Sequence, residues 1–425
     1  MRKAFVTVSV SLLLVLAMPN QSKAQPLVFS GQLSKAQAVA RATSAGFDVR
    51  AALSDSAAAS ARAAQARAAL LPQLSVSGTG MDANLPQFGM PIARQTYVSA
   101  TASLPLLDFA NGARARAQSL EALAAADDAL SARNDVALAA YRAYDRASLA
   151  AAVAQARGAD VADQQANADL VALRVGIGKA ARYQLARAKA GLAVARQAAE
   201  DADAERDEAL NDLKVALDFD LSSQLILSDG LASAPMAGSL ADFDARVLTQ
   251  RPDVIAAKAR SDAADAALRQ AKAEYSPTAA LSGQTYNGAS HPPLGAAGSQ
   301  VSLSISLPVL DGGRRSAQVA EYEAVLDKAR VEYERSALMA QDDVANAWRE
   351  LQAARTNVRT AESALAAAQE NLRVARLRER AGKGIELETL DALSVLASAR
   401  ETALRAQARV DLAVAGVHHA AGDRL

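Results

Sequence analysis

The sequence lacks cysteine, has few aromatic residues, carries no excess of either charge and has no long apolar run beyond its first residues. None of its 425 residues is Cys, which excludes disulfide frameworks, Cys-ligated zinc, thiol catalysis and lipid attachment to a cysteine. Aromatic residues make up 4% of the chain and hydrophobic residues 51%, so this apolar content, rich in Ala, suits close-packed long helices better than a thick globular core. The 46 basic and 46 acidic residues are intermixed, which leaves no basic stripe for nucleic acid.

The first residues have the pattern of an export signal. Arg2 and Lys3 precede an apolar run over residues 4–18, and Ser22-Lys23-Ala24 forms a small-x-small cleavage site before Gln25. The run is shorter than the roughly 20 residues that a spanning helix needs. We therefore expect residues 1–24 to be a signal peptide and the mature chain to be exported.

An internal repeat organises the rest of the chain. Residues 71–78, 104–108 and 174–178 return in the same order as residues 276–283, 307–311 and 380–384, each after about 205 residues. This order predicts a first structural repeat over residues 25–218, a linker over 219–239 and a second repeat over 240–425.

Within each repeat the periodicity predicts two strands and long helices. Val301, Leu303 and Ile305 alternate with serines, which in a strand places aliphatic side chains on one face and hydroxyls on the other. The expected strands cover about 73–81, 97–105, 278–286 and 299–307. Nearly Pro-free segments predict helices of about 64 and 69 residues, each returning through a Gly-containing turn to form a helical hairpin with its tip at 175–179 or 381–385.

Four strands per chain imply partners. They cannot close a barrel, and an open sheet edge in lipid leaves unpaired backbone groups that cost several kcal/mol each. Two chains would supply eight strands and almost no lumen, whereas three would supply twelve strands and a channel. The fold class expected is therefore mainly α with a small β part, in which duplicated helical hairpins form a trimeric α-barrel tunnel and four transmembrane strands per chain form a shared 12-stranded β-barrel.

Two motifs carry a family resemblance. Leu307-Pro308-Val309-Leu310-Asp311-Gly312-Gly313-Arg314, and Arg251-Pro252-Asp253-Val254 followed by an Ala-rich helix that ends at Tyr275-Ser276-Pro277, resemble the TolC family of outer membrane efflux proteins, in its non-lipidated branch. The resemblance implies a homotrimer in the outer membrane of a Gram-negative bacterium. It also implies a periplasmic helical tunnel that docks on a periplasmic adaptor (membrane fusion) protein and an inner-membrane pump.

The function expected from this resemblance is a passive exit duct of a tripartite efflux pump for small molecules. An exit duct for type I protein secretion has the same architecture and stays open as an alternative. A periplasmic coiled-coil adaptor or scaffold is an alternative of another class, but it predicts a single hairpin and no duplicated strand pairs. No enzyme signature and no cofactor site are expected from the motifs in the sequence. No metal site is expected either, because the three His at 291, 418 and 419 lack the spacing of metal ligands.

The candidate functional residues lie at the two tips. By the resemblance, the residues expected to contact the adaptor are Val175, Gly176, Ile177, Ala381, Gly382 and Lys383. Glu388 and Asp391 share one helix face just after the second tip, and three copies would bring six carboxylates to the pore entrance as a cation-selective ring; ordinary helix-start carboxylates are the alternative reading. The groups available as breakable gate links are Arg174, Arg182 and Tyr183, with Glu388 as an acidic partner.

Overall fold

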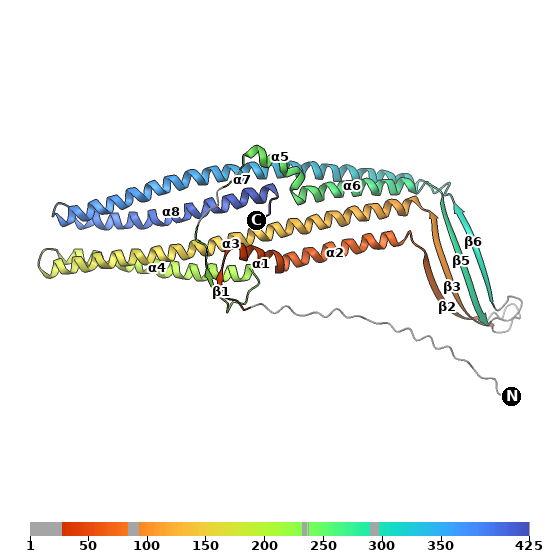
Figure 1. Ribbon diagram of the computed structural model, residues 1–425, viewed down its shortest axis with the longest axis horizontal. Helices are drawn as coiled ribbons and strands as arrows, with labels where there is room; N and C mark the ends of the chain where they lie inside the picture. Colours follow the sequence, from red (N-terminus) through yellow and green to blue (C-terminus); the bar gives the residue numbers. More distant parts are fainter. Residues whose placement is uncertain (1–27, 84–92, 232–235, 237, 290–296, 425) are drawn as a thin grey trace, which may run out of the picture.

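The computed structural model describes residues 28–83, 93–231, 236, 238–289 and 297–424, and the expected signal peptide lies outside them. The chain forms a long rod with a small sheet at one end and two helical hairpin tips at the other (Figure 1). None of the helices in the described part of the chain has both the length and the hydropathy that a membrane crossing requires.

Each repeat supplies one very long helix and several shorter ones. In the first repeat the helices are α1 (Lys35–Ala45), α2 (Phe47–Ala68), α3 (Phe109–Gly176) and α4 (Arg182–Ala216). In the second they are α5 (Leu240–Gln250), α6 (Pro252–Ala273), α7 (Arg314–Arg380) and α8 (Glu386–Ala421). The 68 residues of α3 correspond to about 100 Å of helix.

The long helices are the walls against which the shorter ones pack. Helix α3 contacts α2 and α4, which lie end to end along it, and α7 contacts α6 and α8 in the same way (Figure 1). Helix α3 also contacts α6 and α8, which joins the two repeats. Buried positions on these helices are mostly Ala, such as Ala124, Ala256 and Ala259, which form one of several small core clusters. Small side chains let helix axes approach closely. The expected fold class, mainly α with a small β part, is confirmed by these elements and by the likeness to solved structures reported below.

Four antiparallel strands form the sheet at the other end. Their order is β2 (Gln73–Ala83), β3 (Ala93–Leu107), β5 (Thr278–Ala289) and β6 (Ala297–Ser306). The two hairpins carry the same hydroxyl pair, since the Oγ atoms of Ser77 and Ser99 lie 2.8 Å apart and those of Ser282 and Ser302 also lie 2.8 Å apart. The opposite face is apolar and exposed, with Val76, Val301 and Ile305 at 69%, 77% and 71% exposure; this is the alternation expected from the sequence.

Near the middle of the rod the structure shows a helix break and a short strand pair that the sequence analysis did not predict. The chain breaks between α1 and α2 at Gly46, where a Cβ would lie 2.5 Å from the carbonyl oxygen of Ala42. The segment expected to be a linker contains β4 (Gln224–Leu227), which pairs in parallel with β1 (Ser30–Leu33). Two four-residue strands are too short for an alternation pattern to reveal, and their pairing spans the whole first repeat.

Candidate functional site at the hairpin tips

The two tips reverse the chain with the same backbone geometry. Gly178 and Gly382 have φ values of +71° and +69°, a left-handed conformation that favours Gly. The amide of Lys179 donates to the carbonyl of Arg174 at 2.8 Å, and the amide of Lys383 donates to that of Arg378 at 2.9 Å.

This geometry corrects the alignment of the two tips. It makes Gly178 equivalent to Gly382, whereas the sequence motif aligned Gly178 with Gly384, two residues further on. The positions that match Glu388 and Asp391 in the first repeat are therefore Gln184 and Arg187.

An ion pair joins the two tips within one copy. The guanidinium of Arg174, at the end of α3, pairs with the carboxylate of Glu379, at the end of α7. Glu379 is buried, and its second oxygen accepts a hydrogen bond of 2.6 Å from the hydroxyl of Thr389, which is also buried. Arg174 was expected to make a link at the tip, but Glu379 and Thr389 were missed because nothing in a charge-rich helix marks one carboxylate as buried.

The acidic residues that follow the second tip lie in different environments. Glu388 and Asp391 are exposed, and Glu388 lies 3.5 Å from the guanidinium of Arg378. Glu386, which the sequence analysis did not single out, is buried instead. Burial raises the pKa of Glu386, the neighbouring Glu379 raises it further, and Arg187 opposes both effects.

The other predicted tip residues lie at the surface. Among the described residues neither Arg182 nor Tyr183 has a hydrogen bond or ion pair with another side chain, and Tyr183 is 69% exposed. Of the predicted adaptor-contact residues, Gly176, Ile177, Ala381, Gly382 and Lys383 are exposed and Val175 is half-buried. The structure thus leaves this end of the rod open to a partner.

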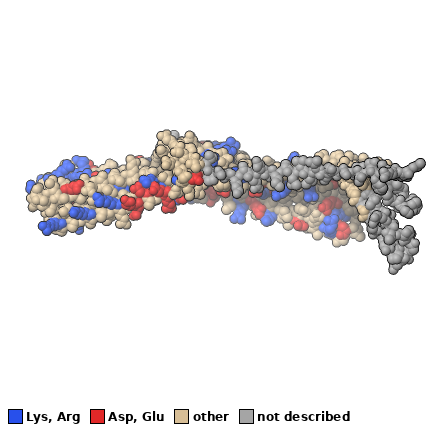
Figure 2. All heavy atoms as spheres, turned by 90° about the horizontal axis from the view of Figure 1, so that it is seen from below, with Lys and Arg blue, Asp and Glu red and all other residues tan. Residues whose placement is uncertain are grey.

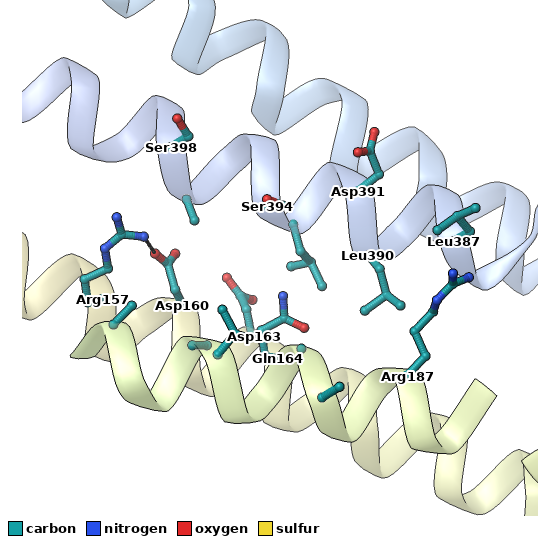
Figure 3. Close-up of a pocket in the computed structure, with 17 residues that line it drawn as sticks. Arg157, Asp160, Asp163, Gln164, Arg187, Leu387, Leu390, Asp391, Ser394 and Ser398 are labelled. Atoms are coloured by element: carbon teal, nitrogen blue, oxygen red, sulfur yellow. Dashed lines mark ion pairs between the residues drawn. The ribbon is translucent and has the colours of Figure 1, made fainter. Parts of the chain in front are cut away.

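A groove of about 650 Å³ runs between the two hairpins just above the tips (Figure 3). Its lining residues come from α3, α4 and α8, and Arg187 and Leu390 reach toward the space between the helices. Beside it an ion-pair network joins α3 to α8, in which Arg400 contacts Asp160 at 2.7 Å and Asp163 at 3.3 Å. This network fixes the spacing of the hairpins and was not foreseen, because its partners are far apart in the sequence.

No cluster of His, Asp or Glu side chains that could hold a metal ion occurs among the described residues. The site is instead a surface of turns, exposed charges and one buried ion pair. Such a surface can contact another protein or line an opening.

Comparisons with known proteins identify this architecture. Residues 245–423 match the family model described as outer membrane efflux protein. A comparison with curated protein sequences found no match.

Solved structures match over nearly the whole chain. The outer membrane protein VceC of Vibrio cholerae is 20% identical with a TM-score of 0.80, over 92% of this chain and 96% of that one. The MtrE outer membrane channel of Neisseria gonorrhoeae is 22% identical with a TM-score of 0.80, over 92% and 89%. The CmeC outer membrane channel of Campylobacter jejuni is 18% identical with a TM-score of 0.79, over 91% and 85%. The MtrE and CmeC structures are described as channels, and the likeness to all three shows that this chain has their fold.

Proposed function

We propose that this chain, whose residues 245–423 match the model of the outer membrane efflux protein family, is the outer-membrane exit duct of a tripartite efflux pump. In this role it conducts small molecules passively, and an inner-membrane transporter supplies the energy.

The observation that carries the proposal is a sheet left incomplete beside a rod about 100 Å long. In the described chain β2 and β6 each pair on one side only, and one face of the sheet exposes aliphatic side chains. Joining β6 of one copy to β2 of the next removes both edges, and three copies give twelve strands around a lumen. The apolar face then meets lipid and the hydroxyl face meets water.

The tips provide the contact with the other pump components in this proposal. They lie at the far end of the rod from the sheet (Figure 1), so a duct held in the outer membrane by its strands extends its tips into the periplasm. Exposed turn residues such as Ile177 and Lys383 are the contact points for a periplasmic adaptor.

The same tips form the entrance to the duct. Glu388 and Asp391 are exposed, so three copies place six carboxylates at this opening, where they favour cations. The Arg174–Glu379 pair is the link that opening of the entrance must break or carry along, because it ties the two hairpins of one copy together.

Planar bilayer recordings test the duct and its entrance together. Wild-type protein purified from the outer membrane should form channels that prefer cations, and Glu388→Gln/Asp391→Asn should lose that preference and change the conductance. The matched control, Glu334→Gln/Glu362→Gln, removes two exposed carboxylates of α7 away from the tip and should conduct like wild type.

The outcomes separate the two parts of the proposal. Unchanged currents in the tip variant would remove the acidic ring and leave the duct intact. Recovery of wild-type protein as a periplasmic monomer without channel activity would overturn the duct itself.

A further inference from the structure

The duplicated tips differ sharply in charge although their backbones are alike. Between Leu173 and Ala190 the first tip carries five basic residues and no acidic residue. The equivalent second-tip segment, residues 377–394, carries three basic and four acidic residues. A turn that only reverses the chain requires no such difference, since its Gly residues alone satisfy the backbone.

Four of the five basic residues form no ion pair within the described part of the chain. Arg174 is held by Glu379, whereas Lys179, Arg182, Arg187 and Lys189, which we call the basic tip, make no salt bridge there, and Arg187 acts on Glu386 only through its electrostatic field. All four are exposed. Figure 2, which views the α4 side of the rod, shows Lys and Arg gathered at the tip end and Asp and Glu further along.

Leaving these charges unpaired is unfavourable for an isolated tip. Arg182 and Lys189 are seven residues apart on α4 and so share a face, separated by about 10 Å along the helix axis, slightly more than the Debye length of roughly 8 Å at physiological salt. Their mutual repulsion is partly screened at this spacing, and an acidic partner placed against this face turns it into attraction.

Exposed apolar side chains accompany the basic tip. The side chains of Leu173, Ile177 and Tyr183 are 65%, 61% and 69% exposed. Large apolar and aromatic residues interleaved with Arg are the composition of energetically important protein contacts.

We propose that the basic tip docks an acidic protein surface, namely Asp or Glu side chains at the end of a helical hairpin of the periplasmic partner; this rests on the proposed function. The first tips therefore carry the electrostatic attachment, and the second tips keep their carboxylates for the entrance. An anionic lipid surface is disfavoured by the contrast between the tips. A membrane meets both tips alike, and its phosphates would be repelled by the exposed Glu388 and Asp391 of the second tip.

Binding of a designed peptide tests the proposal. The probe is a helical hairpin peptide with four Glu at its turn, compared with hairpins that carry four Gln or four Lys there. Wild-type detergent-solubilised channel should bind the Glu hairpin best, with an affinity that falls as salt rises. Arg182→Glu/Lys189→Glu should weaken this binding about tenfold or more and should instead bind the Lys hairpin.

The matched control reverses two exposed basic residues of α7 that lie away from both tips, Arg349→Glu/Arg359→Glu, and should bind the Glu hairpin like wild type. Equal binding of the Glu and Gln hairpins, or equal weakening by the control, would overturn the proposal. Binding to phosphatidylglycerol vesicles that exceeds binding to the Glu hairpin, and that Arg182→Glu/Lys189→Glu abolishes, would assign the basic tip to lipid and overturn it as well. Channel formation in planar bilayers is recorded on the same preparations, so a failed docking with intact channels leaves the proposed function standing.

Discussion

Lys35 holds three helices together through an ion cluster in the middle of the rod. Its ammonium lies 2.6 Å from Asp145 of α3 and also pairs with Asp411 of α8, and the hydroxyl of Tyr141 donates to Asp411 at 2.7 Å. Both carboxylates are buried. Because two carboxylates face one ammonium, the cluster has one negative charge in excess when both are ionised. Burial raises the pKa of Asp145 to about 6, with Lys35 opposing this effect and Asp411 adding to it.

This raised pKa predicts a pH-dependent stability. Because folded Asp145 holds its proton up to about pH 6 and the unfolded carboxyl releases it near pH 4, the free energy of unfolding should fall as pH rises through this interval and then level off. The loss is on the order of 2 kcal/mol. Asp145→Asn should remove this pH-dependent loss. The free energy of unfolding of the variant, relative to that of wild type, should therefore rise from pH 4 to pH 6.5. Urea unfolding at a series of pH values measures this, and a difference that does not vary with pH would contradict the prediction.

Removing the cation of the cluster should lower the free energy of unfolding more than removing one carboxylate does. Lys35→Met leaves Asp145 and Asp411 buried without a counter-charge, and the loss of one partner of a buried pair costs about 3–5 kcal/mol. The triple variant Lys35→Met/Asp145→Asn/Asp411→Asn should recover most of this stability. Lys258→Met, which changes an exposed lysine of α6, is the control and should stay within about 0.5 kcal/mol of wild type in urea unfolding.

At the scale of the elements, the sequence was most informative where a pattern repeats locally. The aliphatic and serine alternation around Val301 predicted a strand with one apolar face, and the absence of Pro predicted the long helices. By contrast, the β1–β4 pair and the Arg174–Glu379 pair join segments about 200 residues apart, and no local periodicity encodes them. The site was therefore located by its Gly turns, but its buried partners came only from the structure.

The Ala-rich composition makes its own prediction about how closely the helices approach. Ala124 of α3 is buried against Ala256 and Ala259 of α6. Ala124→Leu should force these helices apart and destabilise the chain by about 1–3 kcal/mol. The control Ala139→Leu changes an exposed position of the same helix and should have little effect. Thermal unfolding of both variants measures the difference, and equal melting temperatures would show that close helix approach is not what Ala provides.

At the scale of the whole molecule, β2 and β6 each leave one edge unpaired among the described strands, and these two edges lie on opposite sides of the sheet. Their arrangement favours head-to-tail joining of β6 to β2, which closes into a ring, over a symmetric dimer that pairs β2 with β2. Because the chain has no Cys, engineered cysteines report on this without interference.

Ser75→Cys on β2 combined with a cysteine at Gln300, Ser302 or Ser304 on β6 should give intermolecular products with a short bismaleimide crosslinker for at least one of the three pairs. The products should end at three times the mass of one mature chain, because a ring of three copies leaves no free edge. Ser75→Cys with Ser282→Cys, which places the second cysteine on an inner strand, should give none. Ser75→Cys alone should also remain uncrosslinked. A β2-to-β2 product would instead indicate a symmetric dimer in which β6 stays unpaired, and such a sheet could not enclose a duct.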